Sequence, residues 1–553
     1  MKMNLISKIM VPLLLIINIA MFHGCGDSSN SKIQSKTLSS IIIQPKTPDN
    51  LLAGETLQFT ATGAYSDGSV EDISPLVSWR VSDTVNTAIS KSGLLTITGG
   101  VPPPGSAATD AGATAGVAAT AGEKTSAAGS SSAYNESSNS APDDGLIDVS
   151  VIASLSGVIS KVVSLKISLA DGPSIYLQSG GTENKSGQNI TVSDTDKSAV
   201  KVTNKGTLYL RNSSITTTGN STSAINSAAF GLNAAVLTRS YGKIDVTNTR
   251  IITSGTGAAG IFAGGKESSI NAKDVKIKCS ADGARGINAA QGGDLTAMDI
   301  NILVSGADSP AIATDAGGGT IAASHVTART TSDKGSPCIY VDRDGKVTVS
   351  SSNLKAEISE GAVITGNGIL NLKNTDITGG ICGLKAHTVM ETKDTGSVTI
   401  SGGSITATEG DAIIVTGTKA DITVEDRTKI TFAKGYKILN VTNSGSSVFT
   451  AAGLKLNGDL AAEEESSLAI SLNVSATLTG IITNAALTID PTSQWIVKGD
   501  STLTDLDIEG VGKIPENIKD NGYTIYYDSN SNVNTWLRGE TYDLSDGGKL
   551  TPK

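Results

Sequence analysis

The residues of this chain that could carry chemistry are carboxylates, and they are scattered along the sequence. Asp376, within Asn374-Thr-Asp376, could act as an acid or base in glycoside hydrolysis. That reaction needs a second carboxylate about 5 to 10 Å away, and the sequence offers no evident partner. Asp342, Asp344 and Glu360 are near one another, but the segment around Asp342 and Asp344 is typical of a turn. Glu463-Glu-Glu465 is interpreted as a solvated loop. We therefore expect no enzyme activity, no metal site and no cofactor.

Histidines and tyrosines offer two further possibilities. His325 and His387 stand in different repeats, so surface positions are favoured over catalysis or metal binding. Tyr209, Tyr241 and Tyr340 are candidates for contact with sugar rings, which would allow carbohydrate binding without catalysis. The competing interpretation of each tyrosine is a strand residue that packs on its neighbours. The three tyrosines are the candidate ligand contacts of the sequence.

A loose repeat of about 25 residues, running from Lys197 to Ile430, must position these side chains. Each unit holds three short apolar strands separated by turns of Gly, Ser, Thr and Asn. A period of this length is typical of a solenoid, and three strands per unit predict a right-handed parallel β-helix. One apolar anchor recurs at Val200, Val236, Ile261, Ile287, Ile312, Ile339, Val363, Leu384 and Ile413.

Aromatic residues gather at the C-terminal end of this repeat. Residues 486–553 hold two of the three Trp and four of the eleven Tyr. Large aromatic side chains can seal the end of a solenoid whose core residues are small. Because an open last rung would template aggregation, we expect a β-helix over residues 173–485 and final rungs with a β cap over residues 486–553.

Three stretches of the repeat region resemble known β-helical families. Asn374-Thr-Asp376 is similar to the Asn-Thr-Asp fragment of polygalacturonase-like glycosidases, although the Gly-His-Gly element of that family is missing. The segment Gln494–Leu503 resembles the final rungs of autotransporter-type adhesins. The span from Ser174 to Lys553 resembles exported adhesin-like β-helix proteins of no assigned activity. The adhesin resemblance implies a surface rod and brings no functional residue with it.

The N-terminus carries the signals of an exported lipoprotein. Lys2 and Lys8 precede an apolar stretch, Ile9–Phe22, which is too short for a membrane span and is typical of a secretory signal. The following Gly24-Cys25 resembles a bacterial lipoprotein box. The resemblance implies a signal peptide over residues 1–24, a lipid on Cys25, a tether over residues 25–38, and an address at the bacterial cell surface or outer membrane. The alternative is ordinary secretion with Cys25 removed.

Five segments between residues 39 and 169 together form one recognisable pattern: Ile41–Pro45, Ala53–Phe59, Tyr65–Ser69, Val77–Arg80 and Ala88–Leu94. In this order they are similar to bacterial immunoglobulin-like domains of group 2, which implies a small β-sandwich. Residues 99–145 interrupt the pattern with a run of Pro, Ala, Gly, Ser and Thr that cannot bury enough surface to fold alone. We favour an insertion into the sandwich. The alternative is an interdomain linker, with the later strands belonging to the next domain.

Charge and cysteine content limit the partners and the bonds that this chain could form. The chain has 553 residues, a net charge of −10 and no basic cluster, so nucleic acid is not expected as a partner. Besides Cys25 there are three cysteines, Cys279, Cys338 and Cys382, whose spacing fits neither a zinc site nor a disulfide framework. Small buried thiols are the expected state of these three.

The predicted fold class is all-β, with an N-terminal immunoglobulin-like β-sandwich followed by a right-handed parallel β-helix and a C-terminal β cap. The functional hypothesis is a non-catalytic surface lipoprotein, held to a membrane through the lipid on Cys25. Its β-helix would adhere to an extracellular glycan or a surface protein. Two alternatives stay open, a polysaccharide-degrading lyase or glycoside hydrolase and a passive structural spacer.

Overall fold

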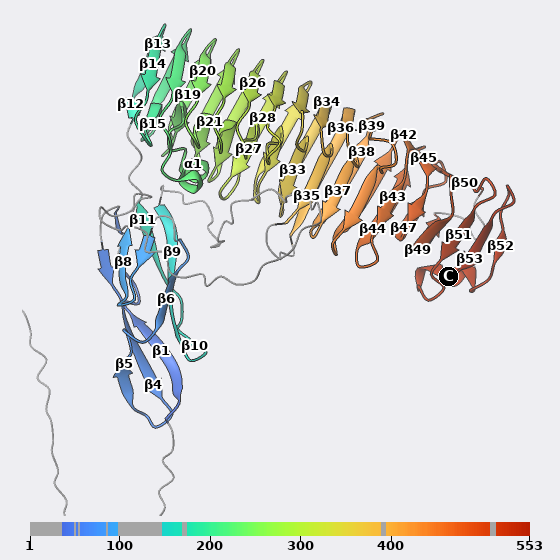
Figure 1. Cartoon of the computed structure of the whole chain (residues 1–553), viewed down its shortest axis with the longest axis horizontal. Coiled ribbons are helices and arrows are strands. Elements are labelled where there is room, and N and C mark those ends of the chain that lie inside the picture. The colour runs from blue at the N-terminus through green and yellow to red at the C-terminus, as the bar shows by residue number, and fades with distance from the viewer. Residues whose placement is uncertain are drawn as a thin grey trace, which may run out of the picture.

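The computed structural model describes residues 36–48, 51–52, 56–83, 87–97, 146–168, 174–388, 394–508 and 516–553. Within these residues the chain is almost entirely β-structure, and its C-terminal part is a right-handed parallel β-solenoid of about 15 turns (Figure 1). The predicted all-β class and the solenoid are thereby confirmed. No helix in this part of the chain is long and apolar enough to cross a membrane.

An N-terminal module precedes the solenoid and consists of three small sheets. The first sheet contains β1 (Leu38–Gln44), β4 (Thr60–Tyr65) and β5 (Val70–Asp72). The second sheet contains β10 (Val158–Ile159), β9 (Leu146–Leu155), β11 (Val163–Ser168), β2 (Leu51–Leu52) and β6 (Ser78–Val81). The third sheet contains β3 (Thr56–Gln58), β8 (Leu94–Ile97) and β7 (Thr87–Ile89). Strand β9 pairs with both β6 and β11, so strands from the two sides of residues 99–145 share one sheet. Phe59 is fully buried at the centre of the module, and the ring of Trp79 packs beside it at a centroid distance of 6.2 Å. Its immunoglobulin-like identity and the domain limits stay predictions.

Thirteen turns of the solenoid each contribute one strand to a parallel sheet that runs along it. Its strands are β12 (Ser174–Ser179), β15 (Ser198–Thr203), β18 (Val236–Thr238), β21 (Ala259–Gly264), β24 (Arg285–Ala290), β27 (Ile312–Asp315), β30 (Ile339–Val341), β33 (Ala362–Thr365), β35 (Leu384–His387), β37 (Ile413–Thr416), β40 (Leu439–Thr442), β43 (Leu460–Ala462) and β46 (Ile482–Thr483). The inward column of this sheet is the predicted anchor column, with one exception. Ile339 pairs with Ala362, and Ala362 pairs with Leu384, so the anchor predicted at Val363 is wrong by one residue. Because side chains alternate along a strand, that single step places Val363 on the outward face.

The other strands of each turn form a 25-stranded sheet and a smaller four-stranded sheet. The larger contains β13 (Thr182–Ser186), β14 (Asn189–Val192), β16 (Thr207–Arg211), β17 (Ser214–Thr217), β19 (Lys243–Thr247), β20 (Arg250–Thr253), β22 (Ser269–Lys273), β23 (Lys276–Cys279), β25 (Gly293–Met298), β26 (Asn301–Val304), β28 (Gly319–Ser324), β29 (Thr327–Thr330), β31 (Lys346–Ser350), β32 (Asn353–Ala356), β34 (Ile369–Gly379), β36 (Thr395–Ala407), β38 (Lys419–Glu425), β39 (Lys429–Thr431), β41 (Ser446–Ala452), β44 (Ser467–Asn473), β47 (Ala485–Ile489), β49 (Ser501–Ile508), β51 (Thr524–Tyr527), β52 (Tyr542–Asp543) and β53 (Lys549–Pro552). The smaller contains β42 (Lys455–Asn457), β45 (Thr477–Gly480), β48 (Gln494–Val497) and β50 (Ile518–Lys519). The inward Val, Ile, Leu and Ala side chains of all three sheets form one continuous buried core.

A short helix, α1 (Ala224–Phe230), is inserted between β17 and β18 and accounts for the long step between the first two anchors. The side chain of Ser223 caps it by accepting a hydrogen bond from the Asn226 backbone N–H at 3.2 Å. Gly231 ends the helix at a φ of 71°, and a Cβ there would lie 2.6 Å from the Phe262 ring. Glycine is therefore required at this position, where the helix turns back onto β21 and β24.

The first rung of the solenoid carries charged side chains where later rungs are apolar. Glu183 pairs with Leu208, and Lys185 pairs with Leu210, two fully buried core residues of the next turn. The Lys185 ammonium lies 2.9 Å from Glu183 Oε2, which also accepts a hydrogen bond from the Tyr176 hydroxyl at 2.9 Å. Inward-pointing charges on an edge strand oppose pairing with another chain. This ion pair therefore covers the open N-terminal end of the core.

Aromatic residues close the opposite end, as the sequence predicted. Trp495 and Tyr527 are fully buried in the last turns. The indole N–H of Trp495 donates to the Gly480 carbonyl oxygen at 3.0 Å, and the Tyr527 hydroxyl donates to the Glu540 carbonyl oxygen at 2.8 Å. A 3₁₀ turn, η1 (Val533–Leu537), packs against these rungs. Each ring thus fills core volume while its polar atom keeps a partner.

Three cysteines lie in the solenoid core. Cys279, Cys338 and Cys382 are buried and form no disulfide with one another. Burial raises the pKa of the Cys279 thiol to about 11 and that of the Cys338 thiol to about 12. These are the small apolar core residues that the sequence predicted.

Candidate functional site

The register of the 13-stranded sheet brings two carboxylates into adjacent turns. Asp315 is the last residue of β27 and pairs with Ala290 of β24. In the next turn Thr314 pairs with Val341, so Asp342, the residue after Val341, lies beside Asp315. Thr314 is fully buried, and by alternation Asp315 and Asp342 point to the outward face. Neighbouring strands lie about 4.8 Å apart, which sets the spacing of the two aspartates.

The same outward column continues with Thr365 and His387. Val341 pairs with Ile364, which places Thr365 beside Asp342, and Thr365 itself pairs with His387. We call Asp315, Asp342 and Thr365 the Asp ladder. It lies at the ends of the strands β27, β30 and β33, near the middle of the row of turns in Figure 1.

Asp315 is neutralised by a two-point ion pair. Arg285 Nε lies 2.9 Å from Asp315 Oδ2, and Arg285 Nη2 lies 3.4 Å from Oδ1. The Asn288 amide also donates to Asp315 Oδ2 at 2.9 Å and to the Ala228 carbonyl oxygen of α1 at 3.3 Å. Arg285 and Asp315 expose only 12% and 9% of their side chains, so solvent screens this pair weakly. Asp315 is therefore held in a fixed geometry by Arg285 and Asn288.

Asp342 has a different environment. It forms no ion pair with any residue in the described ranges, and its Oδ1 accepts a hydrogen bond from the Thr365 hydroxyl at 2.9 Å. Burial, and next the negative charge of Asp315, raise the pKa of Asp342 to about 6. The hydrogen bond from Thr365 and the nearby Arg343 act in the opposite direction. The two neighbouring carboxyl groups thus differ in their partners, because only Asp315 is paired with the Arg285 guanidinium.

Tyr340 stands next to this pair of aspartates. It pairs with Ala313 and Val363 in the outward column adjacent to the Asp ladder. Burial and the charges of Asp342 and Asp315 raise the pKa of its phenol, so it stays a neutral hydroxyl. The site therefore combines an aromatic ring, two hydroxyl groups and two carboxyl groups on one face of the sheet.

A second ion pair lies on the following turns. Lys385 Nζ lies 3.1 Å from Glu360 Oε1, and the Ser359 hydroxyl donates to Glu360 Oε2 at 2.8 Å. Burial and the charge of Lys385 lower the pKa of His387, which favours the neutral imidazole. Glu360 is therefore tied to its own lysine. Within the described parts of the chain, no three His, Cys, Asp or Glu residues are grouped so that they could hold a metal ion.

The three candidate tyrosines lie in different places. Tyr209 is in β16 of the 25-stranded sheet, with the guanidinium of Arg211 at 5.3 Å from its ring centroid. Tyr241 is in a turn at a φ of 65°, with the ammonium of Lys205 at 5.7 Å from its ring centroid. Tyr340 alone of the three adjoins the Asp ladder. Their ligand contacts stay predictions, and Cys25 lies outside the described residues.

The other polar residues considered from the sequence fall outside the Asp ladder. Asp376 is exposed in β34 of the 25-stranded sheet and accepts a hydrogen bond from the Ser404 hydroxyl at 2.6 Å. Asn374 has a φ of 47°, like Asn212 and Asn248 in the equivalent turns, so this tripeptide is part of a stacked polar turn. His325 lies in another turn, and 61% of its side chain is exposed.

Sequence reasoning missed Arg285 and Asp315, and it interpreted Asp342 only as a turn residue. A usable signal was present, because both aspartates stand three positions after an anchor, Ile312 and Ile339. Equal offsets from a repeat anchor predict neighbouring positions on one face. No comparable signal marks Arg285, because it precedes its own anchor and reaches across the turn to Asp315 in the next rung.

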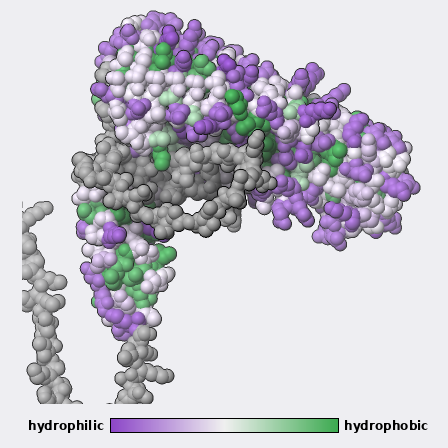
Figure 2. Space-filling model, viewed as in Figure 1, coloured by the Kyte–Doolittle hydropathy of each residue, from purple (hydrophilic) through white to green (hydrophobic). Residues whose placement is uncertain are grey.

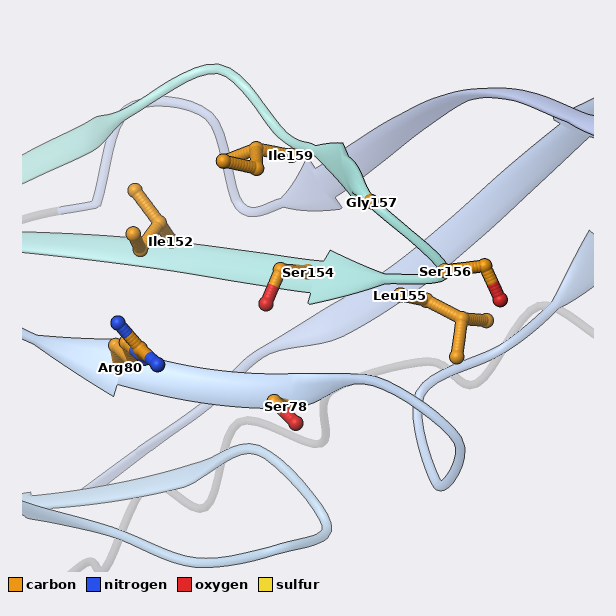
Figure 3. A pocket seen from close by; sticks show the side chains of 8 residues that line it. All are labelled: Ser78, Arg80, Ile152, Ser154, Leu155, Ser156, Gly157 and Ile159. Carbon is orange, nitrogen blue, oxygen red and sulfur yellow. The ribbon is translucent and has the colours of Figure 1, made fainter.

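The N-terminal module has a shallow groove of its own (Figure 3). Residues from β6, β9 and β10 line an open depression of about 360 Å³, with Arg80 lying against Ile152 and with Ile159 on the other side. Figure 2 shows hydrophobic residues on this module, whereas the visible solenoid surface is mostly hydrophilic. The eight lining residues include no carboxylate, so the groove lacks the mixed polar character of the Asp ladder.

Comparisons with known proteins give little further information. No family model matches the chain. A segment of 67 residues is 45% identical to ice-binding protein 1 of Shewanella frigidimarina; this is 12% of the present chain and only 7% of that protein. The family 28 exopolygalacturonase of Yersinia enterocolitica aligns with 67% of the present chain and 85% of its own, at 11% identity and a TM-score of 0.27. At these values the likeness has no bearing on activity.

Proposed function

We propose that this chain is an exported, lipid-anchored surface protein whose β-solenoid binds a saccharide without cleaving it. The observation that carries the proposal is the Asp ladder with Tyr340 beside it. Sugar-binding sites commonly combine an aromatic ring, which packs on the sugar ring, with polar groups that bond to the sugar hydroxyls. Carboxylates accept hydrogen bonds from these hydroxyls, and protein hydroxyl groups both accept and donate. Tyr340, Asp342 and Thr365 place these groups on one face of two adjacent turns, at strands β30 and β33.

The site suits binding better than hydrolysis. Glycoside hydrolysis uses one protonated carboxyl group and one free carboxylate that acts as a nucleophile or base. Asp342 could serve as the first because its pKa is raised to about 6. Asp315 is poorly placed to serve as the second, because Arg285 and Asn288 occupy both of its oxygens. Glu360 is bound to Lys385 in the same way.

A glycan-array screen of the purified protein tests the proposal. Wild type is expected to bind at least one immobilised glycan, and Tyr340→Ala is expected to weaken that binding by about tenfold or more. Tyr209→Ala is the matched control, because it removes a half-buried strand tyrosine from a different sheet. If both variants bind like wild type, the Asp ladder is not the binding site.

Cleavage of a polysaccharide is the second candidate, and the pairing of Asp315 with Asp342 on adjacent turns favours it. An assay for newly formed reducing ends, run on every glycan that binds, separates the two. Release by wild type that is lost in Asp342→Asn would establish an enzyme. Binding without release supports the proposal, and no binding at all would favour a spacer or protein adhesion.

The anchoring part of the proposal depends on Cys25. A membrane lipid on this residue would place the N-terminal module between membrane and solenoid. Mass spectrometry of the mature protein is expected to find a diacylglycerol-modified Cys25 as the first residue. A mature chain that begins elsewhere would mean secretion without an anchor.

A further inference from the structure

Hydrogen-bond acceptors predominate at the Asp ladder. Asp342 and the two hydroxyl oxygens of Thr365 and Tyr340 can all accept from a ligand. Asn288 lies two turns before Tyr340 in the same outward column, where it is fully buried and donates its amide to Asp315 and to the Ala228 carbonyl oxygen. The outward groups of Asp342, Thr365 and Tyr340 therefore suit a ligand that donates hydrogen bonds.

Within the part of the chain that the structure describes, the three cations beside the ladder each have an anionic partner. Arg285 is paired with Asp315, and Lys385 is paired with Glu360. Arg343, which follows Asp342 in the chain, has its Nη2 3.4 Å from Asp394 Oδ2. The remaining charge at the ladder is that of Asp342, which makes no such pair within the described ranges.

We infer that the Asp ladder selects uncharged, hydroxyl-rich saccharides and rejects polyanionic ones. This inference rests on the proposed function and names the ligand class of the same site. Sugar hydroxyls would donate to Asp342 and to the neighbouring acceptors, with the Tyr340 ring against the sugar face. A ligand carboxylate would meet Asp342 with no free cation to neutralise it, and juxtaposed like charges are strongly unfavourable at a partly desolvated contact.

The test uses pairs of oligosaccharides that share a backbone and differ in charge. One pair is a β-1,4-glucan hexasaccharide and its C6-oxidised form. The other is a methyl-esterified α-1,4-galacturonan hexasaccharide and its de-esterified form. Calorimetric titration of the purified protein at neutral pH and low salt is expected to show at least one uncharged member binding about tenfold or more tightly than its carboxylated counterpart.

Two isosteric variants locate the discrimination. Asp342→Asn removes the carboxylate of the ladder and is expected to reduce the preference for the uncharged member to about threefold or less. Asp344→Asn is the matched control, because Asp344 is exposed in the adjoining turn and its carboxylate accepts a hydrogen bond from the Asn367 amide. It changes the net charge equally and is expected to keep the full preference.

The outcomes separate the inference from the function on which it rests. A carboxylated saccharide that binds as tightly as its uncharged counterpart, with binding lost in Tyr340→Ala, would overturn the inference and leave saccharide binding standing. A preference that Asp342→Asn and Asp344→Asn affect equally would also overturn it. If no oligosaccharide or array glycan binds, the proposed function itself fails.

Discussion

Replacing Asp342 with asparagine should stabilise the protein at neutral pH. The pKa of Asp342 is raised from its ordinary value of 3.8 to about 6, chiefly by burial and then by the charge of Asp315. Between pH 4 and pH 6 the folded chain therefore holds a proton that the unfolded chain has released. Stability falls as pH rises through this window, because the folded state binds more protons than the unfolded state.

The expected gain in stability follows from the raised pKa of Asp342. A pKa that rises from 3.8 to about 6 corresponds to about 3 kcal/mol, because each tenfold change in proton affinity is worth about 1.36 kcal/mol. Asparagine carries no charge and keeps an oxygen that can accept the hydrogen bond from Thr365. Asp342→Asn should therefore recover most of this free energy above pH 6 and almost none of it near pH 4. The charges that surround Asp342, on Asp315, Arg285 and Arg343, are the same in both proteins.

Urea unfolding at a series of pH values measures the difference. The gap in unfolding free energy between Asp342→Asn and wild type should grow from a few tenths of a kcal/mol near pH 4 to about 2 to 3 kcal/mol at pH 7.5. The exposed neighbour again supplies the control, because Asp344→Asn should give a small gap at every pH. A gap that does not vary with pH would refute the argument, since it would mean that Asp342 ionises in the folded chain as it does in the unfolded one.

Three further outcomes follow from the solenoid. Replacing both Glu183 and Lys185 with leucine removes the charged cover of the first rung, and light scattering should then detect end-to-end dimers or larger species absent from wild type. Phe449→Ala empties a fully buried core position and should destabilise the protein by about 3 to 5 kcal/mol in urea unfolding, whereas Val448→Ala, at a position 44% exposed, should cost less than about 1 kcal/mol. Cys338 is fully buried with a pKa raised to about 12, so maleimide should label it only after denaturation; rapid labelling of the native protein would contradict this.

The solenoid could be predicted from sequence because its signal is repeated many times. Each turn supplies an apolar anchor, a glycine or asparagine turn and a strand, and an error in one turn is corrected by its neighbours. The error at Val363 shows the limit of this reasoning. Ala362 and Val363 are both apolar, and the larger Val363 is the expected anchor by size, but the register gives the inward position to Ala362. Burial of a strand side chain is decided by pairing with adjacent turns, and that pairing is not visible within one unit.

The candidate site was less predictable because its residues are polar and come from different parts of the unit. Asp315 and Asp342 share an offset from their anchors, so their adjacency could have been inferred. Arg285 stands two residues before its anchor, and its contact with Asp315 depends on a long side chain that crosses to the next turn. The raised pKa of Asp342 depends chiefly on its burial and then on the charge of Asp315. Strand register alone does not determine this.

The regularity of the solenoid also explains how such a site can arise at little structural cost. An outward position contributes nothing to the core, so a polar residue there leaves the inward column of Ile312, Ile339 and Ala362 unchanged. Two such residues in consecutive turns are automatically neighbours at the strand spacing of about 4.8 Å. Stability alone would favour an uncharged residue at position 342, and a structural ion pair there would have supplied a cation. The pH-dependent stability of Asp342→Asn and its saccharide preference should therefore change together, because both depend on the same carboxyl group.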